Sequence, residues 1–363
     1  MTLPIVFKLP FELCYERYCL SAAQLSPFCQ NATFFQDLVI RCVRYAFANI
    51  PASIGRVFFS KEVAHPFFRF RLLRHGYFRC PIPYFEVKRH GFRGLWIAVD
   101  PQNEPDVIVY YCHGGGFSMG SNYFYLEFLI AWLTCLKAEG FRNPAIFALE
   151  YTLVPDAQWP KQFEETRAAF HFVKESLGRG SAAKICVSGD SAGATLVLSM
   201  LLHPAALNQE PGFDQDDRPA LAVLLSPWTH MVSELNRNTR SDYLNNDSLH
   251  LYARQYAGKL TTNDPVVSPG LSAGRWKKAS PLDGYRIIHG SEEVFSPGID
   301  EMVRQMEKDG ALVRRLSEPA GIHAWPVVNL FLGGSRKERL SGLRKMTEYV
   351  VDSRLKPSFR KMI

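Results

Sequence analysis

The stretch Ile185-Cys186-Val187-Ser188-Gly189-Asp190-Ser191-Ala192-Gly193 decides the fold. It opens with an apolar, β-branched run and leads into the helical run Thr195-Leu196-Val197-Leu198. This order predicts a strand, a sharp turn and a helix, with small residues beside Ser191 that let strand and helix approach closely. The turn would hold the Ser191 hydroxyl above a sheet, at the positive end of a helix. Since G-x-S-x-G also occurs in ordinary turns, its surroundings must decide whether Ser191 is a nucleophile.

Strand-like and helix-like segments alternate on both sides of this stretch. Apolar runs typical of strands cover residues 107–111, 145–149, 185–187, 221–225, 286–288 and 312–316, after an expected strand pair at 84–88 and 94–99. Helical runs cover residues 124–137, 164–177, 192–202, 299–308 and 337–351, and an amphipathic helix is expected at 34–47. This alternation predicts a mostly parallel central sheet flanked by helices. Ligands bind beyond the carboxyl ends of such strands, so the residues that follow each strand are the functional candidates.

A glycine-rich loop, His113-Gly114-Gly115-Gly116, follows the strand expected at 107–111. Consecutive glycines leave their backbone N–H groups unobstructed, and a preorganised donor aimed at an oxyanion is worth about 3 to 4 kcal/mol in the transition state. A phosphate-binding loop is the alternative, but no G-K-[ST] follows the glycines. His113 is interpreted as a residue that shapes the loop rather than as a base.

A serine nucleophile needs a histidine base and an acid that orients the base. Where such a serine follows a strand of a parallel sheet, these residues follow in the order serine, acid, histidine. His323 comes after the last expected strand, where the base should lie, whereas His289 lies within a strand. The acid should follow the preceding strand, which leaves Glu292 and Glu293 as candidates, with Asp300 further along on a helix.

Together these motifs resemble the hormone-sensitive-lipase-type branch of the α/β-hydrolases, and its fungal members most of all. Two further segments support the resemblance, namely Tyr151-Thr152-Leu153-Val154-Pro155 and Leu225-Ser226-Pro227-Trp228. The resemblance runs from about residue 83 to about residue 349. It implies an α/β-hydrolase fold with a helical cap, in which residues 1–80 form an N-terminal cap segment. Residues 81–363 would form the core, with a cap insertion at about 230–280.

The resemblance also implies roles for single residues. It makes Ser191, Glu293 and His323 the catalytic triad, because Glu293-Val294-Phe295-Ser296-Pro297 stands where the family has D-P-L-x-D. Glutamate here replaces the usual aspartate, and Pro297 replaces the second acid. The backbone N–H groups of Gly115, Gly116 and Ala192 would bind the oxyanion, and Gly114 would shape the loop. The family needs no metal and no organic cofactor.

The expected function is a serine hydrolase that cleaves a carboxylic ester, or a related acyl bond, of a small to medium apolar substrate through an acyl-enzyme. The N-terminal segment is aromatic, and most of its rings are expected to pack in the cap core while a few line the pocket. These rings are Phe34, Phe35, Tyr45, Phe47, Phe58, Phe59, Phe67, Phe68 and Phe70. One alternative is a secondary-metabolite biosynthetic hydrolase or acyltransferase that acts on a thioester, lactone or amide. The other is a non-catalytic ligand-binding protein, which the presence of serine, histidine and acid disfavours.

The composition is that of an ordinary globular chain of 363 residues, with 47% hydrophobic and 21% charged residues. The net charge of +7 is partly local, in Arg69, Arg71, Arg74, Arg79, Lys88, Arg89 and Arg93. No nucleic-acid motif accompanies this cluster, so it is interpreted as a solvated face rather than a surface for nucleic acid or an anionic membrane.

Eight cysteines without metal-ligand spacing predict mostly free, buried thiols in a cytoplasmic protein. Neither a signal peptide nor a run of roughly 20 apolar residues that could span a bilayer is expected.

Overall fold

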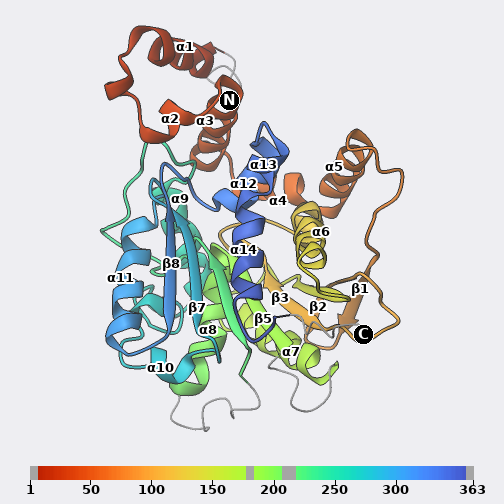
Figure 1. The fold of residues 1–363 in the computed structure, drawn as a ribbon. Helices are drawn as coiled ribbons and strands as arrows, with labels where there is room; N and C mark the ends of the chain where they lie inside the picture. Colours follow the sequence, from red (N-terminus) through yellow and green to blue (C-terminus); the bar gives the residue numbers. More distant parts are fainter. Residues whose placement is uncertain (1–6, 177–183, 207–217, 357–363) are drawn as a thin grey trace.

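A twisted sheet of eight strands runs through the centre of the computed structural model, which describes residues 7–176, 184–206 and 218–356 (Figure 1). The strands are β1 (Tyr84–Arg89), β2 (Phe92–Ala98), β3 (Val107–Cys112), β4 (Pro144–Leu149), β5 (Ile185–Asp190), β6 (Leu221–Leu225), β7 (Tyr285–Gly290) and β8 (Val313–Glu318). Their order across the sheet is β1-β2-β4-β3-β5-β6-β7-β8. The pairs β1–β2 and β2–β4 are antiparallel and the other neighbouring pairs are parallel. The predicted α/β fold with a mostly parallel sheet is confirmed.

Helices cover both faces of the sheet (Figure 1). One face carries α7 (Lys161–Ser176), α8 (Ala192–Ala206), α10 (Trp276–Ala279) and α11 (Ser296–Lys308), and the other carries α6 (Asn122–Ala138) and α14 (Ser341–Val351). The central strand β3 shows how the sequence produces this arrangement. Val109 and Tyr111 pack with α6 and α14, whereas Tyr110 and Cys112 pack with α7 and α8. Because successive side chains point to opposite faces, a strand covered on both sides is a continuous apolar run.

Five α-helices of the described residues come before the first strand and lie at one end of the molecule (Figure 1). They are α1 (Leu9–Cys19), α2 (Pro27–Asn31), α3 (Phe34–Asn49), α4 (Ala52–Phe59) and α5 (Lys61–Arg74). Helix α3, expected from its apolar period, begins with a capping box. The Thr33 hydroxyl accepts the N–H of Gln36 at 3.2 Å, and the Gln36 side chain accepts the N–H of Thr33 at 2.7 Å. This region forms the N-terminal helical cap, and α3 lies beside α9 (Asn246–Ala257).

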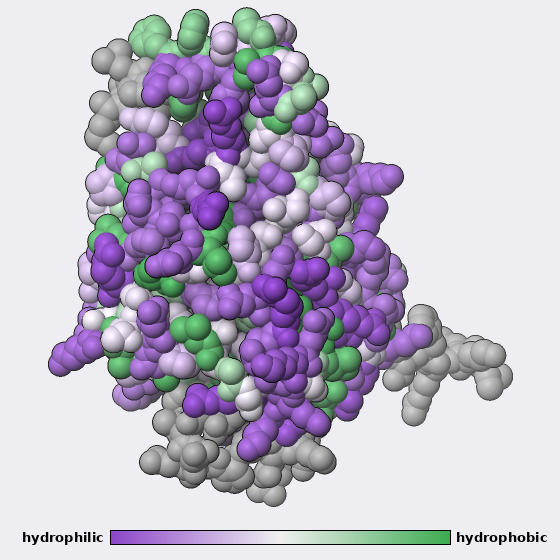
Figure 2. All heavy atoms as spheres, turned by 90° about the vertical axis from the view of Figure 1, so that its left-hand side faces the viewer, coloured by the Kyte–Doolittle hydropathy of each residue, from purple (hydrophilic) through white to green (hydrophobic). Residues whose placement is uncertain are grey.

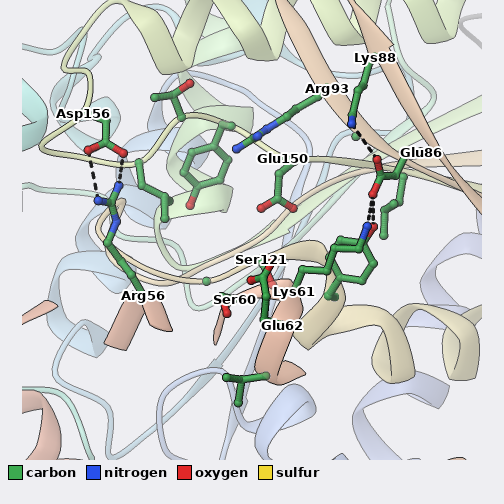
Figure 3. A pocket seen from close by; sticks show the side chains of 18 of the residues that line it. Arg56, Ser60, Lys61, Glu62, Glu86, Lys88, Arg93, Ser121, Glu150 and Asp156 are labelled. Atoms are coloured by element: carbon green, nitrogen blue, oxygen red, sulfur yellow. Dashed lines mark hydrogen bonds and ion pairs between the residues drawn. The ribbon is translucent and has the colours of Figure 1, made fainter. Parts of the chain in front are cut away.

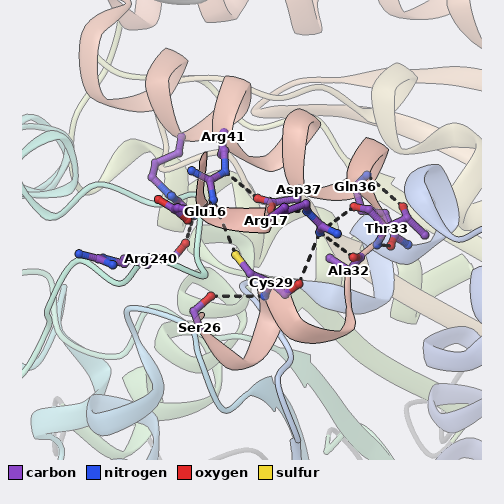
Figure 4. A network of polar contacts seen from close by, with 11 residues as sticks. Glu16, Arg17, Ser26, Cys29, Ala32, Thr33, Gln36, Asp37, Arg41 and Arg240 are labelled. Carbon is purple, nitrogen blue, oxygen red and sulfur yellow. Dashed lines mark hydrogen bonds and ion pairs between the residues drawn. The ribbon is translucent and has the colours of Figure 1, made fainter. Parts of the chain in front are cut away.

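A buried ionic network fixes α1 on α3 (Figure 4). Asp37 on α3 accepts Arg41 Nε at 2.7 Å and, from α1, Arg17 Nε at 3.2 Å. Arg41 also donates to Glu16 of α1 at 2.5 Å. Asp37 and Arg41 are buried, so loss of one member would leave an uncompensated charge. On α1, Leu13 is buried, whereas Phe11, Tyr15 and Tyr18 are exposed.

The C-terminal helical run differs from the single helix expected at residues 337–351. It is divided into α13 (Arg336–Arg339) and α14, which meet at Leu340. The short first helix is a local turn closed by a capping box between Ser335 and Glu338. Near the start of α14, Gly342 lies against Pro326, which is at the start of α12 (Trp325–Leu332). A Cβ at Gly342 would lie 2.4 Å from Pro326 Cβ. A side chain at position 342 would therefore clash with α12.

Three expectations about side-chain environments are wrong. Arg71 belongs to no solvated face, because it is buried and donates to both carboxylate oxygens of Glu127. Most N-terminal rings do not pack in a cap core; those exposed are Phe34, Phe35, Phe58, Phe67 and Phe70. Figure 2 shows hydrophobic side chains at the end of the molecule that α1 forms. The eight cysteines are all free thiols, as predicted, but most are not buried. Only three of the eight are buried, namely Cys29, Cys112 and Cys186.

Phe58, Phe67 and Phe70 are exposed because no side chain of α4 is fully buried and α5 buries one side only. Phe34 and Phe35 lie in the first turn of α3. On α5, Ala64 and Phe68 face the protein and Phe67 and Phe70 face outward. Within the described ranges, no helix is both long and apolar enough to cross a bilayer.

Candidate active site

Ser191 sits on the tight turn between β5 and α8. Its backbone φ is +52°, a left-handed conformation that non-glycine residues rarely adopt and that stores strain at functional sites. The Ser191 N–H donates to the carbonyl of Leu225 on β6 at 2.9 Å, and its own carbonyl accepts the N–H of Thr195 at 3.1 Å. The turn is therefore held from the sheet on one side and from the helix on the other.

The two glycines of the turn are required by the neighbouring strand. A Cβ at Gly193 would lie 2.0 Å from the carbonyl oxygen of Cys112, and one at Gly189 would lie 2.6 Å from the same oxygen. Both distances are far below van der Waals contact, and the atom in the way belongs to the backbone of β3. The close approach of strand and helix that the sequence predicts is confirmed at these positions.

Asp190 joins the serine turn to the glycine loop. Its carboxylate accepts the N–H of Gly114 at 2.8 Å and the hydroxyls of Tyr111 and Tyr125 at 2.8 and 2.6 Å. Burial raises the pKa of Asp190, although the hydrogen bonds from Tyr125 and Tyr111 act in the opposite direction. Sequence analysis assigned Asp190 no role. The available signal was an acid placed inside an otherwise apolar and small-residue stretch.

The glycine loop depends on glycine-specific backbone. Gly115 has φ +114° and Gly116 has φ +61°, and a Cβ at Gly115 would lie 2.1 Å from the carbonyl oxygen of Met119. His113 Nδ1 lies 2.7 Å from the carbonyl of Gly114, and its ring stacks on Tyr151 with centroids 4.5 Å apart. Burial lowers the pKa of His113. The imidazole therefore supports the loop from behind, in agreement with its interpretation from sequence.

His323 and Glu293 face each other in the protein interior. His323 Nδ1 lies 3.8 Å from Glu293 Oε1, and neither atom has a hydrogen-bond partner within the described residues. The other carboxylate oxygen, Oε2, accepts the Ser226 hydroxyl at 2.6 Å and the Gly290 N–H at 3.0 Å. Glu293 is thus anchored through one oxygen and presents the other to the imidazole. Such contacts are often long in unliganded enzymes and shorten when substrate binds.

Two side chains from the chain after β6 hold the loops that carry this pair. Asp242 accepts the N–H of His323 at 3.1 Å and the N–H of Val294 at 2.8 Å. The Ser226 hydroxyl accepts the N–H of Ala324 at 2.9 Å. Ser226 stands in a segment that resembles the family, but no role was predicted for it, and Asp242 stands in no sequence motif.

The pKa of His323 is raised above its ordinary value. Burial alone would lower it, but contact with Glu293 and the negative charges of Asp242 and Asp190 outweigh the burial. The ring is also enclosed edge-on by Phe295 and Tyr243, with centroids 5.1 and 5.8 Å away. The imidazole is therefore held in one orientation and stabilised in its protonated form.

The other candidate acids point elsewhere. Glu292 Oε2 accepts the Ser241 hydroxyl at 3.2 Å. Asp300, on α11, pairs with Arg315 and lies 3.5 Å from His289 Nε2. Of the three acids that sequence analysis left open, Glu293 is the one in contact with His323.

Ser191, His323 and the glycine loop open onto one cavity of about 340 Å³. Gly114, Gly115 and Gly116 line it, whereas Ala192 is buried at the first position of α8 and Glu293 lies behind His323. Its walls are otherwise apolar and come mainly from the cap and α12: Val39, Ile40, Val43, Phe47, Phe58, Phe59, Phe67, Phe124, Val327, Val328, Phe331 and Leu332. The segment after β6 adds Tyr243, Leu244 and Leu249. The arrangement suits nucleophilic attack on an apolar compound in a site shielded from water.

A second hollow, of about 800 Å³, lies between α4, α5 and the first strands (Figure 3). Two ion pairs cross it, Arg56 with Asp156 at 2.6 Å and Lys88 with Glu86 at 3.0 Å. No histidine is found among its described lining residues, and Ser191 is not one of them. The part of the chain that the structure describes also holds no group of three His, Cys, Asp or Glu side chains suited to a metal. The smaller cavity is therefore the candidate active site.

The fold and this cavity define an α/β-hydrolase. A family model described as "alpha/beta hydrolase fold" matches residues 109–327, which is more than half of the chain, and the chain belongs to this family. The matched residues run from β3 to α12 and so include the serine turn, the acid loop and His323.

Individual relatives are more distant. The chain is 26% identical over 252 residues to the esterase LipI of Mycobacterium tuberculosis, with 67% of this chain and 71% of that protein covered. It is also 26% identical over 255 residues to the putative steryl acetyl hydrolase mug81 of Schizosaccharomyces pombe. That match covers 66% of this chain and 63% of the yeast protein, or less than two thirds of its length. Among solved structures, an esterase from the bacterial hormone-sensitive lipase family superposes with a TM-score of 0.68 at 21% identity, covering 90% of this chain and 98% of that one.

Proposed function

We propose that this protein hydrolyses carboxylic esters of small to medium apolar compounds, with Ser191 as nucleophile, His323 as base and Glu293 as the acid that orients the base. The observation that carries the proposal is the unpaired Glu293 Oε1 facing the unpaired His323 Nδ1 at 3.8 Å, behind a cavity that both His323 and Ser191 line. A buried carboxylate oxygen without a partner is costly unless it serves an imidazolium.

The reaction follows from this arrangement. His323 removes the proton of the Ser191 hydroxyl as its oxygen attacks the ester carbonyl, and Glu293 stabilises the resulting imidazolium. Backbone N–H groups of Gly115, Gly116 and Ala192 hold the negatively charged oxygen of the tetrahedral intermediate, while Gly114 shapes the loop. The intermediate collapses and expels the alcohol, which takes the proton from His323. Water, deprotonated by the same imidazole, then attacks the acyl-enzyme and releases the acid.

The enzyme class is that of the carboxylester hydrolases of the hormone-sensitive lipase type. The family match, the esterase LipI and the bacterial esterase structure support this class. The raised pKa of His323 fits it as well, because the imidazole must hold a proton during the attack.

The substrate follows from the cavity walls. We assign residues 1–80 and about 230–280 to a cap over the core of residues 81–363, since helices α3 and α4 and residues 243–249 supply much of the apolar lining. A cavity of about 340 Å³ with aromatic walls suits an apolar acyl or alcohol group better than a sugar or a peptide. The steryl acetyl hydrolase name of the yeast relative agrees with a bulky apolar alcohol.

Fluorophosphonate labelling tests the nucleophile directly. A labelled and digested sample should carry the adduct on Ser191, and Ser191→Ala should abolish labelling. Ser199→Ala is the matched control, because Ser199 is equally buried, at 5% exposure, and lies on the helix that Ser191 precedes. An adduct on another serine, or none in folded protein, would contradict the mechanism.

Three finer assignments belong to the proposal. The aromatic walls also fit the polycyclic or polyketide-like intermediates of secondary metabolism, in which a thioester, lactone or amide would be cleaved or transferred. Mass spectrometry after incubation with a panel of acylated natural products separates the addition of water from transfer to another acceptor. We place the enzyme in the cytoplasm on the chemistry of its free thiols, two of which are exposed. We also propose that the chain belongs among the fungal members of this family, as the sequence resemblance implies.

A further inference from the structure

We propose that the cap docks on an anionic lipid surface through the outer side of α4 and α5. We define the docking face by its exposed apolar side chains: Ile54, Val57, Phe58, Val63, Phe67, Phe70 and Leu73. Exposed apolar side chains gathered on two adjoining helices are unusual for a protein surface that faces only water.

Helix α5 shows that this exposure is organised. Ala64 and Phe68 are buried against the body of the protein, whereas the exposed Val63, Phe67 and Phe70 recur at helical spacing on the flank next to them, about 100° round the helix. An ordinary surface helix is polar on its outer side. Helix α5 instead exposes an apolar flank, which continues to Leu73 beside Arg69 and has no covering element in the described chain.

The charges around the docking face select an anionic partner. Residues 1–80 hold ten Lys and Arg against four Asp and Glu, so +6 of the chain's net charge of +7 lies there. Arg69, Arg74 and Arg79 are exposed and form no ion pair with any described residue. Helix α13 adds exposed Arg336 and Lys337 and half-buried Arg339, and Arg336 and Arg339 line a common hollow with His75, the residue after α5.

Aromatic and aliphatic side chains flanked by cations are the composition of helices that lie in a membrane interface. A second copy of this chain would bring the same cations together, which disfavours self-association through this face. Nucleic acid would meet aliphatic Ile54, Val57 and Leu73 where it needs stacking platforms. Part of the Lys and Arg cluster that the sequence predicts to be a solvated face is thus reassigned to a lipid-facing surface.

The docking face is continuous with the candidate active site. Phe58 and Phe67 are exposed on it and also line the cavity that contains Ser191. An apolar ester dissolved in a membrane could therefore pass from lipid to cavity without crossing water. This part of the inference rests on the proposed function, whereas binding to lipid does not.

Vesicle co-sedimentation of the full chain tests the proposal. The probes are vesicles of phosphatidylcholine alone and vesicles that contain a minority of phosphatidylserine. We expect binding to the phosphatidylserine vesicles that weakens as salt is added, because screening shortens the range of the attraction. Phe70→Ser and Leu73→Ser should each reduce the partition coefficient by roughly tenfold. Arg69→Gln and Arg74→Gln should each reduce it by about fivefold on the anionic vesicles alone.

Leu312→Ser is the matched control, because Leu312 is 55% exposed, against 58% for Phe70 and 57% for Leu73, and lies outside the cap. It should bind as the wild type does. None of these residues lines the cavity, so hydrolysis of water-soluble p-nitrophenyl acetate without vesicles should stay unchanged and reports on the proposed function separately. Equal binding to both vesicle types, wild-type binding by the Phe70 and Leu73 variants, or a dimer that these variants dissolve would each overturn the proposal.

Discussion

The carboxylate of Asp190 accepts a hydrogen bond from the backbone N–H of Gly114 at 2.8 Å, and so ties the serine turn to the glycine loop. The same carboxylate receives the hydroxyls of Tyr111 and Tyr125 in a fully buried site. The residue next to the proposed nucleophile thus sets the distance to the proposed oxyanion donors.

Asp190→Ala should be strongly destabilising, because it leaves three buried donors without an acceptor at about 1 to 3 kcal/mol each. We expect the free energy of unfolding, measured with denaturant, to fall by at least about 3 kcal/mol. Tyr125→Phe is the control, since it removes one of the three hydrogen bonds and should cost only about 1 kcal/mol. Equal losses in the two variants would show that Asp190 does not hold the loop.

Glu293→Gln should nearly abolish turnover without unfolding the protein. Nucleophile and base would remain, but the imidazole would lose the charge that orients and stabilises it, and kcat should fall on the order of 10⁴-fold. Glu292→Gln is the matched neighbour, and since its partly exposed carboxylate contacts Ser241, kcat should fall by less than about tenfold. If Glu292→Gln proves the inactive variant, the acid has been assigned one residue too far along the loop.

The pH dependence of kcat/KM should show His323 titrating above the ordinary histidine value of 6.5, because its pKa is raised. Only the neutral imidazole acts as a base, so activity on p-nitrophenyl butyrate should rise with pH through that higher midpoint. Glu293→Gln removes the charge that raises the pKa, so its residual activity should rise at lower pH. A midpoint at or below the ordinary value in the wild type would contradict the ion pair.

The same shift affects stability. A folded-state pKa above the unfolded value contributes stability that is fully present below the unfolded pKa and is lost as the pH rises through the folded one. The stabilising contribution of His323 should therefore decrease between these two values.

Asp242→Asn should slow catalysis more than it weakens substrate binding. Asp242 touches no reacting atom and acts as a positioning residue, because it holds the backbone N–H groups of Val294 and His323. We expect kcat to fall with little change in KM, together with a shift of the pH midpoint to lower values, since the Asp242 charge raises the pKa of His323.

Asp106→Asn is the control for this variant. Like Asp242, Asp106 accepts backbone N–H groups, here those of Arg142 and Asn143, but it lies before β3 and away from the cavity. It should leave the pH profile untouched. A profile that does not move in Asp242→Asn either would reduce Asp242 to a purely structural role.

Val43→Trp should shorten the acceptable acyl chain. Val43 projects from α3 into the cavity, and the added ring would fill space that a longer chain needs. We expect kcat/KM for p-nitrophenyl octanoate to fall by more than about tenfold, while that for the acetate changes by less than about threefold. Leu312→Trp, outside the cap, should affect neither ester, and an equal loss on both esters in Val43→Trp would point to general disruption instead.

The parts of the site that short local motifs encode could be predicted from the sequence. The serine turn, the glycine loop and His323 each follow a strand, and the apolar runs of those strands are visible because they are buried on both sides. Glu293 was separated from Glu292 only by family register. The structure adds the physical difference, which is that Glu293 faces His323 and Glu292 faces Ser241.

Contacts between distant segments could not be found in this way. Asp242 reaches His323 across 81 residues, and nothing near Asp242 in the sequence indicates that contact. The aromatic cap was misjudged for a related reason, because the apolar period of a helix shows which residues share a side but not whether another element covers it. On α5 the flank next to the buried residues, which includes Phe67 and Phe70, remains exposed.

The walls of the cavity come largely from α3, α4 and α12, whereas Ser191 and Glu293 follow the ends of strands that the sheet holds rigidly. Selection can therefore rework the cavity walls one side chain at a time without disturbing the bond-breaking groups. The strained turn is far less free to change, because Gly189 and Gly193 press against the backbone of β3. We expect relatives with this architecture to keep the same chemistry while their substrates differ, and we expect most of their sequence differences to lie in the cap.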